Sequence, residues 1–312
     1  MKAENKQMND DQKKLGDGLK TIGDWQRYIA TQLHQAEIWF GHGAVDGWDE
    51  ANLLLSELTQ LHHAELGNYL SCRLAKHERE QLAAWLEQRL EDRVPAAYLV
   101  NKAWFAGLPF YVDERVLVPR SPIAELIENN FAPWLTKTPE QILDLCTGSA
   151  CIAIACAYAF PDAIVHASDI SADALEVAEI NVSDHDLEER VALFQSDGFS
   201  RLPETKYDLI VTNPPYVDAE DMADLPEEYR HEPELGLAAG NDGLDLVRDI
   251  LLHSPDYLTE EGMLICEVGN SWVHMAELWP EVPFVWLSFE HGGDGVFAIN
   301  RSALVAARAC FE

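Results

Sequence analysis

The stretch QILDLCTGSACIAIACAYAFPDAIVHASD, residues 141–169, decides the fold of this chain. It begins and ends with short apolar runs, 141–146 and 163–169, each of the length and composition of a buried strand. The small-residue segment between them, 150–158, predicts a helix that starts directly after a glycine turn. Two apolar strands joined by a helix form the repeating unit of a parallel sheet.

The same alternation continues towards the C-terminus. Further strands are predicted at 191–197, 207–213, 262–268, 283–289 and 295–300, with helices between most of them, for example at 172–182 and 243–257. This pattern predicts an α/β domain with a doubly wound, seven-stranded, Rossmann-like sheet over residues 121–312. The last two strands are joined by EHGGDG (290–295) without a helix, so we expect them to form an antiparallel hairpin at one edge.

The N-terminal part has a different texture. Residues 1–20 are polar and predict a disordered tail. Across residues 21–95 the apolar positions recur at helical spacing, as at Trp25, Ile29 and Leu33, and they predict a small helical domain. Residues 96–120 mix aromatic, valine and turn residues and predict a hairpin linker between the two domains.

The net charge of the chain limits the classes of macromolecule that it is expected to bind. Its 312 residues carry 22 Lys+Arg against 54 Asp+Glu, a net charge of −32. Such a surface repels nucleic acid, whose binding rests on Lys/Arg contacts to phosphate, so we expect no direct nucleic-acid binding. It attracts a basic macromolecule instead, and an acidic coat that serves solubility alone is the alternative interpretation.

The cysteines and the apolar runs indicate the class of protein. The chain has six cysteines and no C-x-x-C pair, so no metal site is predicted. The first residues lack the apolar core of a signal peptide, and no apolar run reaches the length of a membrane span. We therefore expect a cytoplasmic protein that is not bound to a membrane and whose thiols are reduced.

Candidate functional motifs fall at four predicted strand ends, where the ligands of such sheets bind. The first is CTGSA, 146–150. Gly148 lets the backbone turn tightly near a ligand, and the following helix offers unpaired N–H groups. The motif departs from the dinucleotide pattern G-x-G-x-x-G because Cys146 and Ala150 stand where glycines would be expected.

Two acids end the next two strands. Asp169 follows the turn by roughly 20 residues, the spacing at which an acid binds a ribose diol in this architecture. The alternative is that Asp169 caps the next helix, although Ser171 can do so. Asp197, followed by Gly198, is placed to accept an adenine amino group, but a plain turn is an equal interpretation.

The fourth motif, NPPY at 213–216, has a specific chemistry. Pro214 and Pro215 have no N–H and a fixed φ, so the loop is stiff and presents carbonyl oxygens. Asn213 adds a side-chain carbonyl. Two rigid acceptors can bind both hydrogens of one planar NH₂ group, and Tyr216 supplies a flat face against it. Holding both N–H bonds directs the nitrogen lone pair at an electrophile.

In this order, the four motifs resemble those of class I S-adenosylmethionine-dependent methyltransferases, and members with N-P-P-Y modify NH₂ groups. Two branches compete: adenine methyltransferases acting on nucleic acid, and protein glutamine methyltransferases of the HemK type. The second resemblance is closer and covers about residues 94–300. It includes RVPAAYL (93–99), VLVPRSP (116–122), EPELGLAAGNDGLDLVRDIL (232–251) and EVGNSW (267–272). The region from 213 to 240 further resembles the branch that methylates ribosomal protein L-three.

The resemblance implies S-adenosylmethionine as cofactor, a basic ribosomal protein as partner, and a substrate-docking role for residues 21–95. It implies no metal. The residues matched to cofactor binding are Cys146, Thr147, Gly148, Ser149, Ala150, Asp169, Asp197, Gly198 and Asn213. Those matched to the substrate are Asn213, Pro214, Pro215 and Tyr216, of which Asn213, Pro214 and Tyr216 are the expected catalytic residues.

Three alternatives stay open at the sequence level. One is a methyltransferase of peptide-release factors, and another is an adenine-specific methyltransferase, which the net charge disfavours. The third is a catalytically impaired ribosome-assembly factor. It follows from Ala150, because the family usually has glycine there and a methyl group would crowd either the cofactor or the helix packing beneath it.

Overall fold

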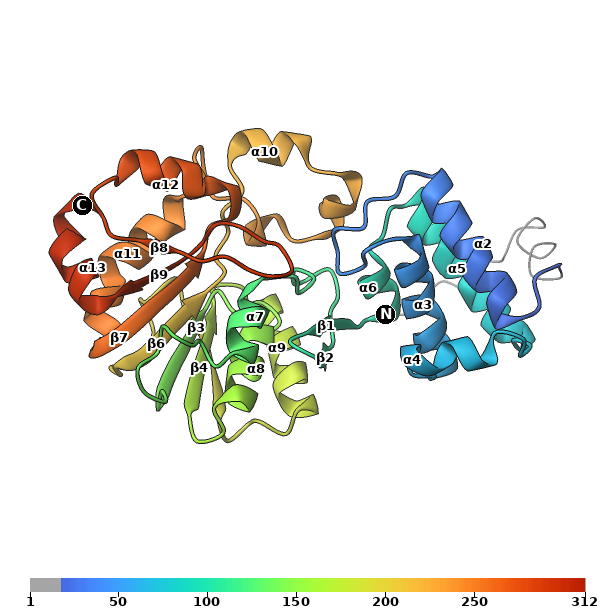
Figure 1. Ribbon diagram of the computed structural model, residues 1–312, viewed down its shortest axis with the longest axis horizontal. Helices are drawn as coiled ribbons and strands as arrows, with labels where there is room; N and C mark the ends of the chain where they lie inside the picture. Colours follow the sequence, from blue (N-terminus) through green and yellow to red (C-terminus); the bar gives the residue numbers. More distant parts are fainter. Residues whose placement is uncertain (1–17, 312) are drawn as a thin grey trace. The chain divides into compact units, whose positions relative to one another are not determined.

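The computed structural model describes residues 18–311, which form two compact units (Figure 1). The first unit contains the described residues up to 101 together with 226–231, and the second contains 102–225 and the described residues from 232 onwards. The tail predicted for residues 1–20 lies outside the described residues, apart from 18–20.

The first unit is helical. Its helices are α2 (Ile22–Gln35), α3 (Gly47–Thr59), α4 (His63–Leu66), α5 (Lys76–Glu91) and α6 (Ala96–Val100). Helix α2 begins with a capping box, in which the Thr21 hydroxyl accepts from the Asp24 N–H and the Asp24 carboxylate accepts from the Thr21 N–H. The apolar stripes of these helices meet around Trp25, Leu54 and Leu82, which are fully buried.

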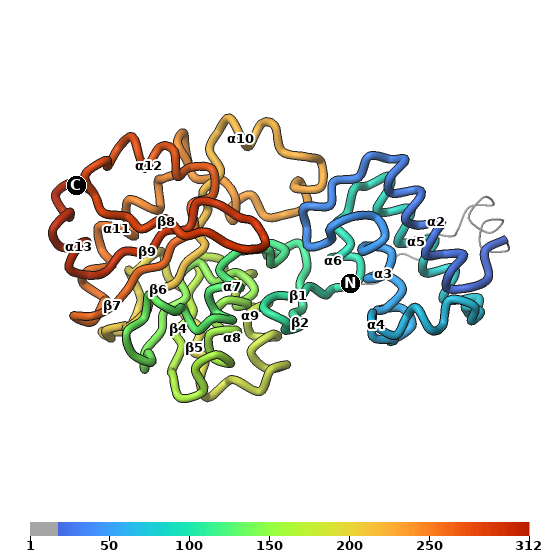
Figure 2. Tube along the Cα trace, in the orientation of Figure 1, coloured from blue at the N-terminus to red at the C-terminus, as the bar shows by residue number. Residues whose placement is uncertain are grey.

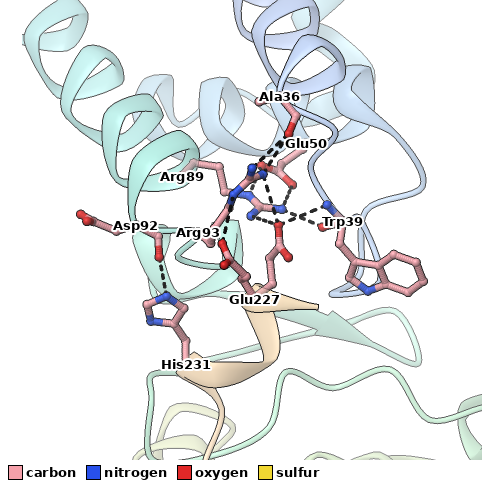
Figure 3. A network of polar contacts seen from close by, with 9 residues as sticks. Ala36, Trp39, Glu50, Arg89, Asp92, Arg93, Glu227 and His231 are labelled. Atoms are coloured by element: carbon pink, nitrogen blue, oxygen red, sulfur yellow. Dashed lines mark hydrogen bonds and ion pairs between the residues drawn. The ribbon is translucent and has the colours of Figure 1, made fainter. Parts of the chain in front are cut away.

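A buried ion cluster fixes residues 226–231 within this unit (Figure 3). Arg89 of α5 is only 1% exposed and lies between two buried carboxylates. Its Nε is 2.7 Å from Glu50 Oε1, and its Nη1 is 3.3 Å from Glu228 Oε1. Its Nη2 also donates to the Trp39 carbonyl oxygen at 2.8 Å. Because charge buried without a partner is costly, these contacts hold the 226–231 segment firmly in the helical unit.

The second unit is built around one seven-stranded sheet (Figure 1, Figure 2). Its strands are β3 (Gln141–Leu145), β4 (Ile164–Asp169), β5 (Val191–Gln195), β6 (Tyr207–Thr212), β7 (Leu258–Glu267), β8 (Val285–Trp286) and β9 (Val296–Asn300). The strand order is β5-β4-β3-β6-β7-β9-β8. Strands β3 to β7 are parallel, and β9 runs antiparallel to both β7 and β8. The predicted α/β fold and its antiparallel edge are confirmed, with β8 shorter than expected.

Helices cover both faces of the sheet (Figure 1). On one face lie α7 (Ile123–Glu128), α8 (Cys151–Ala159) and α9 (Ala172–Asp184). On the other lie α11 (Asp245–Tyr257), α12 (Trp272–Leu278) and α13 (Arg301–Ala307). Successive strand residues supply opposite cores, as Ile142 and Leu143 of β3 do. The short helix α10 (Ala219–Asp224) follows β6.

The segment before the sheet departs from a simple hairpin linker. It holds α6, then the hairpin of β1 (Ala103–Phe105) and β2 (Leu108–Phe110), and then an extended stretch. Asn181 of α9 holds the start of this stretch, because its side chain accepts from the Tyr111 N–H at 2.7 Å and donates to the Tyr111 carbonyl at 3.0 Å.

Within the described residues, no helix combines the length and apolar character that crossing a membrane requires.

Candidate active site

The four predicted motifs occupy neighbouring strand ends. The turn 146–150 follows β3, Asp169 ends β4, Asp197 follows β5 and Asn213 follows β6. Since β5, β4, β3 and β6 are adjacent and parallel, their carboxyl ends share one edge of the sheet. The structure therefore brings together the motifs that the sequence placed at separate strand ends.

The turn after β3 has an alternating left-handed backbone. Cys146, Gly148 and Ala150 have φ values of 62°, 54° and 63°. Left-handed φ costs a residue with a Cβ about 1–2 kcal/mol, which is why glycines are expected at these positions. The turn is held from outside, since the Thr147 N–H donates to the Ser168 carbonyl at 2.9 Å. The chain therefore keeps the glycine-type backbone with a single glycine.

The two faces of this turn differ in crowding. Ala150 is fully buried in the core beside Ala153 and Ile154. A Cβ added to Gly148 would meet nothing within 4 Å. The Ala150 methyl group therefore packs in the core that α8 forms with the sheet. The open side of the turn is at Gly148, where a ligand can approach the backbone.

Asp169 is tied to the turn. One carboxylate oxygen accepts from the Gly148 N–H at 2.9 Å, and the other accepts from the Ser171 N–H at 2.9 Å. Burial raises the pKa of Asp169, and these backbone hydrogen bonds oppose the rise. Ser171 caps α9 by accepting from the Ala174 N–H, so Asp169 is not required as the cap.

The turn after β5 is shaped by a serine that the sequence analysis did not single out. Ser196 is buried, and its hydroxyl donates to the Gly198 carbonyl at 2.8 Å and accepts from the Arg201 N–H at 3.0 Å. Gly198 has φ 49°. Asp197 stays exposed at this turn, so its carboxylate is accessible to a ligand.

The N-P-P-Y loop is anchored on both sides. Asn213 is half-buried and Pro214 is buried directly after β6. The Tyr216 carbonyl accepts from the Ser271 hydroxyl at 2.8 Å, and the Tyr216 hydroxyl donates to Glu267 at 2.9 Å. Val217 then pairs in parallel with Ala238. The loop is therefore fixed by more than its prolines.

Asp144 is a buried acid that the motif analysis overlooked. It is 0% exposed on β3, and its Oδ2 accepts from the Thr147 hydroxyl at 2.5 Å and from the Ala153 N–H at 3.0 Å. Its Oδ1 has no hydrogen-bond partner among the described residues. Burial raises the pKa of Asp144 to about 7. An acid inside an apolar strand was the signal that could have identified it.

An ion pair joins two of the motifs that carry the resemblance to the HemK type. Arg120 of VLVPRSP binds Glu232 of EPELGL through two contacts, Nη1 to Oε1 at 2.6 Å and Nη2 to Oε2 at 2.7 Å. Glu232 is buried and also accepts from the Val118 N–H at 2.9 Å. Such bidentate pairs have a fixed geometry, so the segment before β3 and the segment that follows α10 are held together.

No cluster of three or more His, Cys, Asp or Glu side chains able to hold a metal ion occurs in residues 18–311.

The sheet order, the glycine turn and N-P-P-Y at the end of β6 together define a class I methyltransferase.

Comparisons with known proteins identify the family. The family model described as "Methyltransferase small domain" matches residues 127–227. The ribosomal protein uL3 glutamine methyltransferase of Francisella tularensis is 45% identical over 304 residues, covering 96% of this chain and 96% of that protein. Its namesake from Neisseria gonorrhoeae is 46% identical over 290 residues, covering 92% of this chain and 96% of that protein. The chain belongs to the family of ribosomal protein uL3 glutamine methyltransferases, and the resemblance to the HemK type is confirmed.

A solved structure supports the fold alone. The catalytic domain of hMettl16, in complex with MAT2A 3′UTR hairpin 1, aligns with a TM-score of 0.51 at 16% identity. The match covers 81% of this chain and 91% of that one.

Proposed function

We propose that this enzyme transfers a methyl group from S-adenosylmethionine to the side-chain amide nitrogen of one glutamine in ribosomal protein uL3. The observation that carries the proposal is an N-P-P-Y loop fixed beside a glycine turn, in a chain whose relatives bear the name of that activity. A ribosomal substrate is also consistent with the cytoplasmic location expected from the sequence.

The strand-end residues fit the cofactor. The open space at Gly148 admits a ligand to the backbone, and Asp169 offers a carboxylate at the spacing suited to ribose hydroxyls. The turn 146–150 would hold the methionine part, and Asp197 with Gly198 would border the adenine. When bound, the cofactor supplies a methyl group activated by a positively charged sulfur.

The acceptor nitrogen would be held by the N-P-P-Y loop. The Asn213 side-chain oxygen and the Pro214 carbonyl would accept the two N–H bonds of the glutamine amide, and the Tyr216 ring would cover its flat face. An amide nitrogen is a poor nucleophile because its lone pair is delocalised, so this fixed orientation is the main contribution of the protein.

Two histidines that could be considered as bases, His166 and His231, make contacts away from the N-P-P-Y loop. His166 lies within β4, with its Nδ1 2.9 Å from the Tyr207 hydroxyl, and burial lowers its pKa. The Nε2 of His231 is 2.6 Å from the Asp92 carbonyl oxygen within the helical unit (Figure 3). We therefore assign no general base, and the amide proton leaves to water after transfer.

The protein substrate is proposed to be recognised by charge. A net charge of −32 attracts basic ribosomal proteins and repels RNA, which disfavours an adenine acceptor. The helical unit is the proposed docking domain for this substrate.

The test is mass spectrometry of ribosomal proteins and release factors from cells with and without this enzyme. The proposal predicts one enzyme-dependent methyl group on a uL3 glutamine. An enzyme-dependent methyl on a release factor instead, or none on any protein, would refute it.

A further inference from the structure

A buried carboxylate joins three sequence motifs, one of which is the N-P-P-Y loop. Glu267 ends β7, the strand beside β6, and begins the motif EVGNSW. Its Oε1 accepts from the Tyr216 hydroxyl at 2.9 Å, and its Oε2 accepts from the Ser121 hydroxyl at 2.5 Å. VLVPRSP, NPPY and EVGNSW, which are far apart in the sequence, therefore meet at one side chain.

Glu267 is enclosed rather than exposed to reactants. It is 5% exposed, and burial raises its pKa while the two hydroxyl donors and the charge of Arg120 oppose the rise. Ser121 is itself held, because its hydroxyl accepts from the Ile123 N–H at the start of α7. Both carboxylate oxygens thus have fixed donors, and the group is suited to holding a partner in place.

The Tyr216 ring is confined around this bond. A Cβ added to Gly269 would lie 2.5 Å from Tyr216 Cε2, so the ring packs directly on the Gly269 backbone. At the other end, a Cβ on Gly243 would lie 2.2 Å from the Tyr216 carbonyl oxygen, which also accepts from Ser271. Glycines therefore fix the backbone and one side of the ring, and the hydroxyl bond to Glu267 fixes its tilt.

We propose that Glu267 is a positioning residue that sets the orientation of the Tyr216 ring, and through it the flat face against which the acceptor amide lies. The inference rests on the proposed function for its kinetic consequence. Glu267 acts as a hydrogen-bond acceptor, and its negative charge is not used to remove the amide proton.

The kinetic test compares two substitutions of the same residue. Glu267→Gln keeps an oxygen that can accept from Tyr216, whereas Glu267→Ala removes it. We expect kcat for uL3 to fall about 30- to 100-fold in Glu267→Ala, because small misplacements at a reacting centre have effects of that order. Glu267→Gln should stay within about threefold of wild type with an unchanged pH profile, since its acceptor remains. Glu260→Gln, at an exposed site on the same strand, is the matched control.

Coupling to Tyr216 is measured by a double-mutant cycle. Tyr216→Phe removes only the hydroxyl, and in the Glu267→Ala background it should lower kcat little further, because both changes break the same bond. Cofactor affinity should stay within about threefold in every variant, since none of them touches the turn after β3. A Glu267→Gln variant as slow as Glu267→Ala would show that catalysis depends on the negative charge of Glu267. A Glu267→Ala variant as fast as wild type would show that the hydrogen bond between Glu267 and Tyr216 does not contribute to catalysis. Either result overturns the proposal.

A second readout does not depend on the substrate. In protein with ¹³C-labelled tyrosine rings, the Tyr216 signal is identified by its loss in Tyr216→Phe. It should move in Glu267→Ala and stay near its wild-type position in Glu267→Gln. An unmoved signal in a folded Glu267→Ala protein would overturn the positioning role even if the acceptor proved not to be a uL3 glutamine, so the two proposals fail separately.

Discussion

In the wild-type protein, the free energy of unfolding should fall as Asp144 titrates with rising pH, and Asp144→Asn should abolish this fall. The Asp144 carboxyl is fully buried on β3, and its pKa is raised from 3.8 to about 7 by burial. Asparagine keeps the shape and an oxygen that can accept from Thr147 and the Ala153 N–H, but it carries no charge. The wild-type protein alone should therefore show the titration of this group in its free energy of unfolding.

The sign follows from the two pKa values. Below pH 3.8 the carboxyl is protonated in both states and its stabilising contribution is fully present. As pH rises towards 7, the unfolded chain releases the proton while the folded chain retains it, so stability falls. The loss is complete about one pH unit above 7, once the folded carboxyl has also released its proton. A shift of about 3 units corresponds to about 4 kcal/mol in total, of which about 2.5 kcal/mol falls between pH 5 and pH 8.

The assay is urea unfolding of both proteins at pH 5, 6, 7 and 8, followed by circular dichroism. The difference in free energy of unfolding, wild type minus Asp144→Asn, should decrease steadily with pH. Titrating groups that do not interact with Asp144 are common to both proteins and cancel in this difference, whereas Asp169, whose charge adds to the rise in the Asp144 pKa, makes a smaller contribution of the same origin. A difference that stays constant over the whole range would refute the assignment of a raised pKa to Asp144.

Three further predictions concern the cofactor, the helical unit and the partner. Asp169→Ala should weaken S-adenosylmethionine binding at least tenfold by calorimetry, since each charge-assisted hydrogen bond contributes roughly 1.5–3 kcal/mol; Asp162→Ala at an exposed site is the control, and equal affinities would remove Asp169 from the site. Arg89→Met leaves buried Glu50 without its cation and buried Glu228 with only Arg93, 3.8 Å away, and should cost about 3–5 kcal/mol in urea unfolding, whereas exposed Arg230→Met should cost under about 0.5 kcal/mol; similar losses would contradict the role of the buried cluster. Finally, kcat/KM for intact uL3 should fall with salt while cofactor affinity changes little, because the Debye length shrinks from about 8 Å at physiological salt to about 3 Å at 1 M; a flat substrate response would mean that the acidic surface does not steer the encounter.

Most of the sheet could be predicted because its signals are local. Each parallel strand is a short apolar run, and the glycine turn and N-P-P-Y fall where two of these runs end. A parallel sheet brings such ends together whatever the side chains do, so the positions of Asp169 and Asn213 follow from strand order. The antiparallel edge followed in the same way from a connection without a helix.

The remaining parts depend on contacts between distant residues, which leave no pattern in one sequence. Tyr216 and Glu267 are 51 residues apart, and Arg89 and Glu228 are 139 apart. Residues 226–231, which include Glu228, belong to the helical unit, although the residues on either side of them belong to the other unit. No change in amino-acid composition marks this segment. The positive φ of Ala150 could not be predicted from alanine itself, which normally avoids that conformation, and the only local signal was the glycine expected at this position.

The most direct test of the central claim is methyl transfer by the purified enzyme to purified uL3, mapped by peptide mass spectrometry. We predict one methyl group on the side-chain nitrogen of a single glutamine with the wild-type enzyme. With Asn213→Ala, which retains the cofactor turn but lacks one acceptor for the amide, we predict that this product is almost absent. A methyl group on another type of residue, or undiminished transfer by Asn213→Ala, would contradict the account.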